Sequence, residues 1–336
     1  MKMMKTINTL TRRRFAAAAL LPAALTLATG LGLAGNAAAQ VRDFPNHAVE
    51  LVVPFQPGGG TDALARAFAD ASRKHMPQSV VIVNKPGASG AIGWQDVINA
   101  KPDGYKLAVV TVEVTTLPHM GLAKFTHDDF TPIARLNADQ AAITVRADAP
   151  WNTIEEFLAA ARKDSGTVGV GNAGNGSIWH LAAAALEDKT HVKFNHIPYQ
   201  GAGPAVLALL GGHVDSVAVS PAEVTTYVQA GKLKTLAVMA DQRVKGFEKV
   251  PTLKERNIDL TIGTWRGIAA PKNTPPEVVA YLKSVTVKAA NEPAFREVLE
   301  KQNLGFAYAD EAAFKANMAK DSAYFKTLMA KLNIKN

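Results

Sequence analysis

Short apolar runs recur along the chain and alternate with segments in which apolar residues repeat every three or four positions. The runs are typical of buried strands, and the spaced pattern is typical of helices packed on one face. The predicted strands lie at 49–55, 79–84, 106–111, 167–171, 194–199, 216–220 and 233–240. Because strands alternate with helices, the pattern predicts an α/β fold built on mostly parallel sheets.

Local signals mark where several helices begin and end. Thr153–Glu156 and Ser220–Glu223 have the Ser/Thr-x-x-Glu spacing of a capping box. Gly211 and Gly231 stand where helices are expected to stop. Near the C-terminus, apolar residues at helical spacing between Phe314 and Leu332 predict a long amphipathic helix.

Residues 1–39 have the order of an export signal: cations, then the mostly apolar stretch Phe15–Leu33, then small residues at Ala37–Ala39. We therefore expect cleavage before Gln40. A membrane anchor is the alternative, but proline and glycine interrupt the apolar stretch and a cleavage pattern follows it. Residues 11–15, TRRRF, resemble a twin-arginine motif, although ordinary signal peptides also begin with arginines, so the export route stays open.

Composition narrows the class of protein. The formal net charge of +8 includes five cations in residues 1–39, and without them 32 cations face 29 acids, a net of +3. These charges are interspersed, which argues against nucleic-acid binding and suits an anionic small ligand. No cysteine is present, so disulfides, thiolate metal sites and cysteine nucleophiles are excluded. With the export signal, this predicts a soluble monomer in the periplasm of a Gram-negative cell.

Four predicted strand-to-helix junctions are unusually rich in small residues: 57–62 (PGGGTD), 87–90 (GASG), 171–177 (GNAGNGS) and 201–204 (GAGP). In open α/β sheets the carboxyl ends of strands face the ligand crevice. A helix N-terminus there offers free N–H groups and a dipole that favours anions. One glycine turn alone is more typical of tight packing, but four together predict an anion site made mainly of backbone.

The same stretches fail the tests for enzymes and metal sites. Residues 58–63 lack the lysine of a phosphate-binding loop and place Asp62 where a dinucleotide phosphate would lie. Residues 87–91 miss the last glycine of a nucleophile elbow. His191 and His196 lie on opposite faces of a strand start, and Asp128–Asp129 resembles a solvated turn. We therefore predict a binding protein with no catalytic residue, no metal and no cofactor.

Six motifs together resemble the Bug family, the extracytoplasmic solute receptors of tripartite tricarboxylate transporters. The motifs are PFQPGGGTD (54–62), VNKPGASGAIG (83–93), GNGSIWHLAA (174–183), IPYQGAGPAVLALLGGHVD (197–215), VPTLKE (250–255) and TWRGIAAPKNTP (264–275). The resemblance covers nearly all of 41–336. It implies a two-lobed periplasmic-binding-protein fold of type II that closes over a small carboxylate, holds it by main-chain groups and waters, and delivers it to membrane permease subunits.

The resemblance implies lobe boundaries. The export signal spans 1–39, the first lobe 40–140 plus 267–336, and the second lobe 141–266, with the last helices packed on the first lobe. Asn257 departs from the family, in which glycine is common at this position.

The glycine turns then supply the candidate ligand-binding residues. In the first lobe these are Phe55, Gly59, Gly60, Thr61, Asp62, Ala88, Ser89 and Gly90. Across the cleft they are Ala173, Gly174, Gly176, Ser177, His180, Gly201, Ala202, Pro204 and Asp215. Ser177 is expected both to cap the following helix and to face the ligand.

Three of these candidates keep an alternative role. Asp62 either caps its own helix or accepts from a ligand ammonium or a water. His180 either contacts the ligand or braces its loop, and Asp215 more simply caps a turn. Two other functions also stay open: a periplasmic hydrolase that uses the turns as an oxyanion site, and a sensor that uses the same fold to feed a signalling partner.

Overall fold

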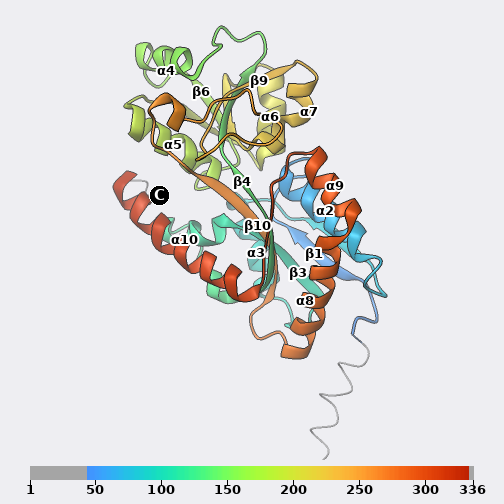
Figure 1. Cartoon of the computed structure of the whole chain (residues 1–336). Coiled ribbons are helices and arrows are strands. Elements are labelled where there is room, and N and C mark those ends of the chain that lie inside the picture. Colours follow the sequence, from blue (N-terminus) through green and yellow to red (C-terminus); the bar gives the residue numbers. More distant parts are fainter. Residues whose placement is uncertain (1–43, 333–336) are drawn as a thin grey trace, which may run out of the picture. The chain divides into compact units, whose positions relative to one another are not determined.

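The computed structural model describes residues 44–332, and the predicted export signal and cleavage site lie outside them. The described chain forms two sheets, each flanked by helices (Figure 1). The first is six-stranded, in the order β11-β4-β10-β3-β1-β2. Its strands are β1 (Val49–Val53), β2 (Val80–Asn84), β3 (Lys106–Thr111), β4 (Phe130–Gln140), β10 (Gly263–Pro271) and β11 (Phe306–Ala309). Its helices are α2 (Gly60–Ser72), α3 (Ala91–Ile98), α8 (Pro276–Asn291), α9 (Pro293–Lys301) and α10 (Glu311–Leu332).

The second sheet is five-stranded, in the order β7-β6-β8-β5-β9. Its strands are β5 (Ala142–Arg146), β6 (Gly169–Asn172), β7 (Asn195–Pro198), β8 (Ser216–Val219) and β9 (Leu233–Val238). Its helices are α4 (Ile154–Lys163), α5 (Ile178–Thr190), α6 (Ala202–Leu210) and α7 (Pro221–Gln229). Each sheet with its helices is called a lobe below, the first lobe carrying the six-stranded sheet. The expected two-lobed α/β fold is confirmed.

All seven predicted strands form, but each sheet is mixed where mostly parallel sheets were expected. β1 runs parallel to β2 and β3, whereas β10 runs antiparallel to β3 and β4. In the second sheet β5 runs antiparallel to β8 and β9. Parallel neighbours need a crossover connection, which is usually a helix. β4 continues into β5 without such a helix, and β9 likewise returns towards β10 without an α-helix.

The two connections between the lobes lie side by side. Ala141, between β4 and β5, donates its N–H to Ile262 O at 2.9 Å and accepts from Met239 N at 2.7 Å. The predicted first boundary, 140/141, therefore falls between β4 and β5, and the predicted return at 266/267 falls within β10. The precise lobe boundaries stay a prediction.

The glycine turns lie where the sequence placed them. Residues 57–62 join β1 to α2, 87–90 join β2 to a 3-10 helix (Ala88–Gly90) and α3, 171–177 join β6 to α5, and 201–204 join β7 to α6. Each turn therefore leaves the carboxyl end of a strand and opens a helix. In Figure 1, α2, α8 and α9 lie together beside β1, while α10 lies across β4 and β10 from them.

Neither of the two predicted capping boxes forms in full: at Thr153 the side-chain cap is present, but Glu156 Oε2 accepts from Asn152 N and not from Thr153 N. Thr153 accepts from Glu156 N at 3.2 Å and caps α4 as expected. The capping box at Ser220 is wrong, because α7 has no side-chain cap and Glu223 points elsewhere. Asn257 has φ +60°, a left-handed conformation that asparagine tolerates better than most residues, which explains why it can replace glycine there.

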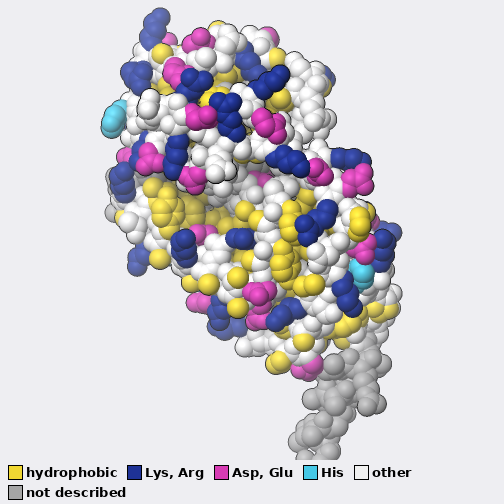
Figure 2. Space-filling model, viewed as in Figure 1, with side chains coloured by type: hydrophobic (Ala, Val, Ile, Leu, Met, Phe, Trp, Pro, Cys, Tyr) yellow, Lys and Arg dark blue, Asp and Glu magenta, His cyan; other side chains and the backbone are white. Residues whose placement is uncertain are grey.

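Charged side chains of both signs are interspersed over the face shown in Figure 2, with no continuous basic stripe. Between residues 44 and 332 no helix is long and apolar enough to cross a membrane. Over the same range, no cluster of three or more His, Asp or Glu side chains is arranged to hold a metal ion.

Candidate ligand site

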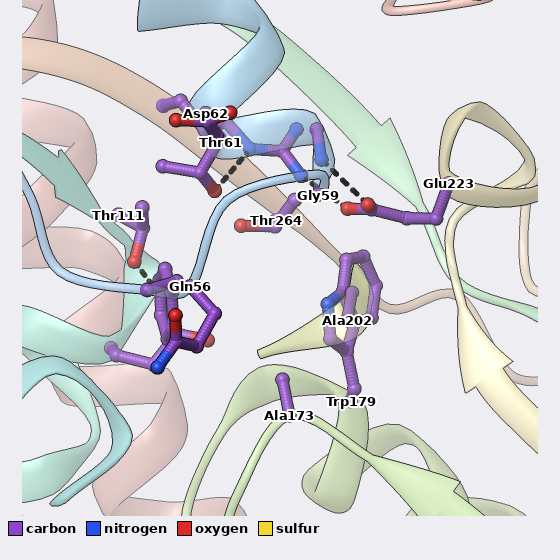
Figure 3. Close-up of a pocket in the computed structure, with 14 residues that line it drawn as sticks. Gln56, Gly59, Thr61, Asp62, Thr111, Ala173, Trp179, Ala202, Glu223 and Thr264 are labelled. Carbon is purple, nitrogen blue, oxygen red and sulfur yellow. Dashed lines mark hydrogen bonds and ion pairs between the residues drawn. The ribbon is translucent and has the colours of Figure 1, made fainter. Parts of the chain in front are cut away.

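A small cavity of about 20 Å³ lies between the lobes, close to the volume that one water molecule needs (Figure 3). Seven of the predicted residues line it: Phe55, Gly59, Gly60, Thr61, Asp62, Ala173 and Ala202. Seven residues that were not predicted also line it: Gln56, Thr111, Glu113, Trp179, Glu223, Thr264 and Arg266. The first glycine turn and β10 form one wall, and elements of the second lobe form the other.

The first glycine turn is held in shape by Asp62. Its carboxylate accepts from Gly58 N at 3.2 Å, from Arg66 at 2.9 Å and from Asn84 Nδ2 at 3.0 Å. Burial raises the pKa of Asp62, but these hydrogen bonds outweigh it and the pKa lies below its usual value. The expected capping role is wrong in detail, since the N-cap is Gly59 and Asp62 sits in the first turn. Its oxygens are already engaged by protein groups.

Arg266, on β10, is the cation of the cavity, and it is 1% exposed. Its Nε donates to Thr61 Oγ1 at 2.9 Å, and its Nη1 pairs with Asp139. Asp139 in turn accepts from Gly305 N at 2.7 Å. Because Thr61 accepts from the guanidinium, its own hydroxyl proton stays available for another acceptor in the cavity.

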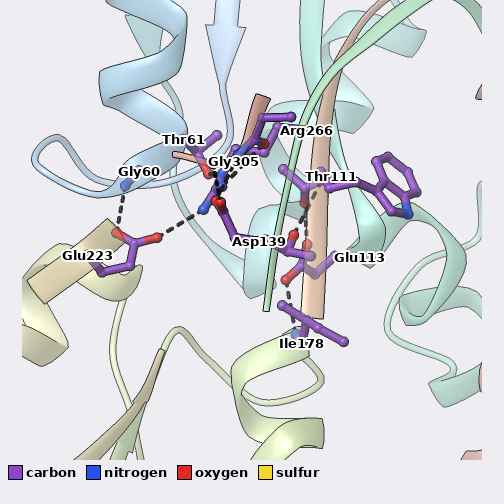
Figure 4. Close-up of polar contacts among 12 residues, drawn as sticks. Gly60, Thr61, Thr111, Glu113, Asp139, Ile178, Glu223, Arg266 and Gly305 are labelled. Carbon is purple, nitrogen blue, oxygen red and sulfur yellow. Dashed lines mark hydrogen bonds and ion pairs between the residues drawn. The ribbon is translucent and has the colours of Figure 1, made fainter. Parts of the chain in front are cut away.

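Glu223 approaches Arg266 from the opposite lobe (Figure 4). Its Oε2 accepts from Gly60 N, the first residue of α2, at 2.6 Å, and its Oε1 pairs with Arg266 Nη2 at 2.9 Å. Burial raises the pKa of Glu223, while Arg266 and the Gly60 N–H act in the other direction. A carboxylate thus occupies the N-terminus of α2 beside a buried guanidinium.

Glu113 makes the reciprocal contact. It follows β3 in a 3-10 helix (Val112–Thr115) of the first lobe, and its Oε1 accepts from Ile178 N, the first residue of α5, at 3.0 Å. Its other oxygen accepts from Thr111 Oγ1. Burial raises the pKa of Glu113, partly offset by these hydrogen bonds. Each lobe therefore sends one carboxylate to a helix N-terminus of the other lobe.

The turn before α5 is braced from within. Ser177 caps α5 by accepting from His180 N at 3.3 Å, as predicted, but it does not line the cavity, where it was also expected. His180 Nδ1 accepts from Gly176 N at 3.1 Å and does not line the cavity, which matches its bracing role. Burial, with His196 beside it, lowers the pKa of His180 to about 4, so the ring is neutral and can accept this hydrogen bond.

The second and third glycine turns touch each other, and of these two turns only Ala173 lines the cavity. Ser89 Oγ donates to Asn175 O across the cleft. Ala88 and Ser89 adopt φ +46° and +53°, and Gly90 has φ +104°. A Cβ on Gly174 would lie 2.6 Å from Ser89 Oγ, so glycine is needed for this contact.

The fourth turn packs directly on the first. Gln56 N donates to Gln200 O at 3.1 Å, next to Gly201. A Cβ on Gly203 would lie 3.0 Å from Gly58 C and 3.1 Å from Gly59 N. Pro204 lies in the first turn of α6, away from the cavity lining. These contacts close the cleft.

Asp215 lies apart from the cavity. Its Oδ2 accepts from Gly169 N at 2.7 Å, and its side chain is exposed at the start of β8. The expected turn-capping role is wrong, because this hydrogen bond goes to the start of β6 and not to the turn that contains Asp215. Of the predicted residues, those of the first turn, with Ala173 and Ala202, are brought together at the cavity, while the others brace or close the cleft around it.

The charged residues of the cavity were missed for identifiable reasons. Arg266 lies within the TWRGIAAPKNTP motif, and its apolar neighbours Trp265 and Ile268 are a signal for a buried strand that was not used. Glu223 was assigned to a capping box that does not form. Glu113 stands alone in the apolar run VVTVEV (109–114), a signal for a buried carboxylate that could have been used.

Comparison with known proteins agrees with this architecture. The sequence profile of the tripartite tricarboxylate transporter family receptor, TctC, matches residues 64–334. A protein of Cupriavidus necator called "UPF0065 protein in gbd 5'region" is 37% identical over 96% of this chain and 98% of its own length.

Three solved structures are also similar. A TctC solute-binding protein from Polaromonas, determined with no ligand, is 64% identical with a TM-score of 0.64, over 86% of this chain and 99% of that one. The periplasmic binding protein BugD is 31% identical with a TM-score of 0.84, over 87% and 99%. MatC from Rhodopseudomonas palustris, with bound malate, is 26% identical with a TM-score of 0.79, over 85% and 99%. The family and these neighbours are solute-binding receptors and not enzymes, which confirms the prediction of a binding protein.

Proposed function

Because the chain belongs to the tripartite tricarboxylate transporter receptor family, whose members are periplasmic solute receptors for small carboxylates, we propose that it captures one carboxylate between its lobes. The permease subunits of a tripartite transporter then receive that ligand from the closed protein. A role in feeding a sensor uses the same binding step and differs only in the partner.

The main support for the proposal is the way in which the Glu223 carboxylate is held. The N-terminus of α2 and the guanidinium of Arg266 converge on one carboxylate, that of Glu223, at the wall of the interlobe cavity. A helix N-terminus with a buried guanidinium is a strong carboxylate site, because charge-assisted hydrogen bonds are roughly twice as strong as neutral ones. The chain therefore contains a formed carboxylate site in the cleft.

The binding mode combines backbone and side-chain groups. The N–H groups of the first glycine turn and the Thr61 hydroxyl are the proposed donors from the first lobe, with Arg266 added to the set predicted from sequence. Ala173 and Ala202 set the opposite wall, and their small side chains leave the space to the ligand. The turns at 87–90 and 174–177 hold the lobes closed in this proposal.

Calorimetry and thermal-shift measurements test the function. Malate, which MatC binds, is the first probe, followed by other dicarboxylates, tricarboxylates, aromatic acids and amino acids. We expect at least one carboxylate to raise the free energy of unfolding by RT ln(1 + [L]/Kd), and with it the melting temperature. The same carboxylate is expected to be recovered unchanged. Absence of binding across all these acids, or conversion of the ligand, would contradict the proposal.

The proposed function in the periplasm requires that the protein be exported. We infer that the protein is exported, by the twin-arginine or the general route, cleaved near Ala39, and released as a monomer beginning near Gln40. Mass spectrometry of the periplasmic protein is expected to give a chain that begins at or close to Gln40. A periplasmic chain that retains residues 1–39 would contradict this.

A further inference from the structure

Glu223 is held entirely by the opposite lobe. Its hydrogen-bond and ion-pair partners in the structure are the Gly60 N–H and the Arg266 guanidinium, both of the first lobe, although Glu223 itself lies on α7 of the second lobe. Glu113 differs, because Thr111 of its own lobe holds one of its oxygens. Glu223 is therefore the carboxylate that can leave without breaking contacts inside its own lobe.

The cavity has no room for a ligand while Glu223 is in place. Its volume of about 20 Å³ holds one water, and even a small organic acid is several times larger. Withdrawal of the Glu223 side chain would provide space and would free both anion-binding groups at once. A ligand carboxylate and the Glu223 carboxylate thus compete for the same two partners.

The sequence at the start of α7 allows a second position for the Glu223 side chain. Ser220 is the N-cap of this helix, is fully buried, and its Oγ has no hydrogen-bond partner among the described residues. Ser220–Glu223 has the spacing of a capping box, in which serine bonds the N–H of the glutamate and the glutamate bonds the N–H of the serine. An unpartnered buried hydroxyl is unfavourable. In this structure the Glu223 N–H donates to Ser220 O at 3.1 Å, and in the capping box it would turn to Ser220 Oγ while the Glu223 carboxylate accepts from Ser220 N.

We propose that Glu223 is an internal stand-in for the ligand: it occupies the α2 N-terminus and Arg266 when the site is empty, and a ligand carboxylate displaces it to the capping box with Ser220. This rests on the proposed function and adds a specificity rule to it. A ligand must present a carboxylate that binds Gly60 N–H and Arg266 better than Glu223 does. Neutral solutes cannot displace it.

Burial of the Glu223 carboxylate favours its displacement by a ligand carboxylate. It raises the pKa of Glu223, which means that the charged side chain is less well stabilised in this position than its close contacts suggest. Displacement by a ligand with better geometry is correspondingly easier, since a buried ion pair gains little over its cost of desolvation.

Chemical rescue tests the proposal without knowledge of the natural ligand. Glu223→Ala leaves a vacancy of carboxylate size beside Gly60 N–H and Arg266. We expect acetate or formate to raise the melting temperature of this variant by about 2–4 °C at concentrations tenfold above Kd, with chloride at equal ionic strength as the control. Wild type and Glu277→Ala, at an exposed position of α8, are expected not to respond. A Glu223→Ala protein that responds to acetate no more than Glu277→Ala overturns the proposal.

Glu223→Gln decides the matter if the alanine variant does not fold. The amide oxygen can still accept from Gly60 N–H, but the ion pair with Arg266 is lost. We expect malate to bind this variant at least tenfold more tightly than wild type. Equal or weaker binding overturns the proposal, because it would mean that Glu223 assists the ligand or is indifferent to it.

Ser220→Ala tests the second position. The melting temperature of the ligand-free protein is expected to stay the same, because the hydroxyl has no partner there. The Kd for malate is expected to rise about threefold to tenfold, the effect of losing a serine N-cap. Unchanged malate binding by Ser220→Ala removes the capping box from the proposal.

Failure of this inference and failure of the proposed function give different results. If carboxylates bind wild type but acetate does not rescue Glu223→Ala, the function stands and the stand-in role is wrong. If acetate rescues the variant but no organic acid binds wild type or Glu223→Gln, the anion site at Gly60 and Arg266 stands, while the proposed function and the displacement of Glu223 by a ligand carboxylate are both wrong.

Discussion

Thr61 connects the glycine turn to the buried cation. Its Oγ1 is the acceptor for Arg266 Nε, and Thr61 is one of the residues that line the cavity. Arg266 also pairs with Asp139 and Glu223, so its side chain is fixed in one orientation. Fixing the guanidinium before the ligand arrives lowers the entropy cost of binding.

Thr61→Val is expected to weaken both binding and folding. The variant removes one hydrogen bond to the ligand and leaves Arg266 Nε buried without an acceptor. We expect a tenfold to hundredfold rise in Kd for malate and a fall of about 1–3 kcal/mol in the free energy of unfolding. Calorimetry and urea unfolding measure the two effects. Thr61→Ser, which keeps the hydroxyl, is the control, and normal malate binding by Thr61→Val would contradict this role.

At the residue scale, the sequence predicted the glycines and Thr61 but not the charges. Glycine triplets and helix-start residues are local signals, read from neighbours along the chain. Arg266 pairs with Asp139 and Glu223, which lie 127 and 43 residues from it along the chain. No local pattern carries such pairs, so the sequence suggested an uncharged backbone site where the structure has a buried ion-pair network.

The glycine turns act in pairs at the scale of elements. The first turn packs on the fourth through Gly203, and the second touches the third through Ser89 and Asn175. Close backbone approach of this kind needs glycine because a Cβ would occupy the contact. The turns therefore determine how closely the lobes can meet.

Gly203→Ala is expected to separate binding from stability. Its Cβ would lie 3.0 Å from Gly58 C, a backbone atom that cannot move aside cheaply. The substitution favours α6 itself, by up to about 1 kcal/mol. We expect malate affinity to fall at least tenfold, while the melting temperature without ligand changes little, because the gain in α6 opposes the loss of the contact with the first turn.

Gly211→Ala, at the other end of α6, is the matched control, because its nearest neighbour is the exposed side chain of His213. Calorimetry compares the two variants. Equal affinity of Gly203→Ala and Gly211→Ala would show that the contact between the first and fourth turns does not control closure.

His180 makes the turn before α5 sensitive to pH. The folded pKa of about 4 lies below the ordinary value of 6.5, so the unfolded chain binds a proton that the folded protein excludes. The stabilisation is therefore complete above about pH 6.5 and is lost as pH falls towards 4. His196 packs edge-on against the same ring, and Glu187 pairs with His196.

His180→Asn keeps an acceptor near Gly176 N–H but does not titrate. We expect the difference in the free energy of unfolding between wild type and this variant to shrink as pH falls from 7 to 4. Urea unfolding at several pH values measures it. A difference that stays constant over this range would contradict the neutral, bracing role of His180.

Elements were easier to predict from sequence than their pairing. Apolar runs located seven strands, because buried strands need continuous apolar residues. β4 was not predicted, because Arg135, Asn137 and Asp139 interrupt its apolar pattern. These side chains form hydrogen bonds that include long-range contacts to Asn317 and Gly305. The antiparallel placement of β5 and β10 depends on the interlobe connections, which strand patterns do not encode.

For the whole molecule, the described residues form a closed receptor whose site is occupied by its own side chains. Glu113 and Glu223 each bridge the lobes to a helix N-terminus, and backbone contacts such as Gln56 N to Gln200 O close the rim. The solute-receptor function explains the two lobes and the cleft. The internal carboxylates explain how the cleft can be closed with so little space inside it.

A crystal structure of the protein with its tightest-binding carboxylate tests the central claim most directly. The account predicts a ligand carboxylate within hydrogen-bond distance of Gly60 N and Arg266 Nη2, in the position that Glu223 occupies here. Wild type without ligand, crystallised in the same form, is the reference. A bound carboxylate placed elsewhere in the cleft, with Glu223 still on Gly60 N and Arg266, would contradict it.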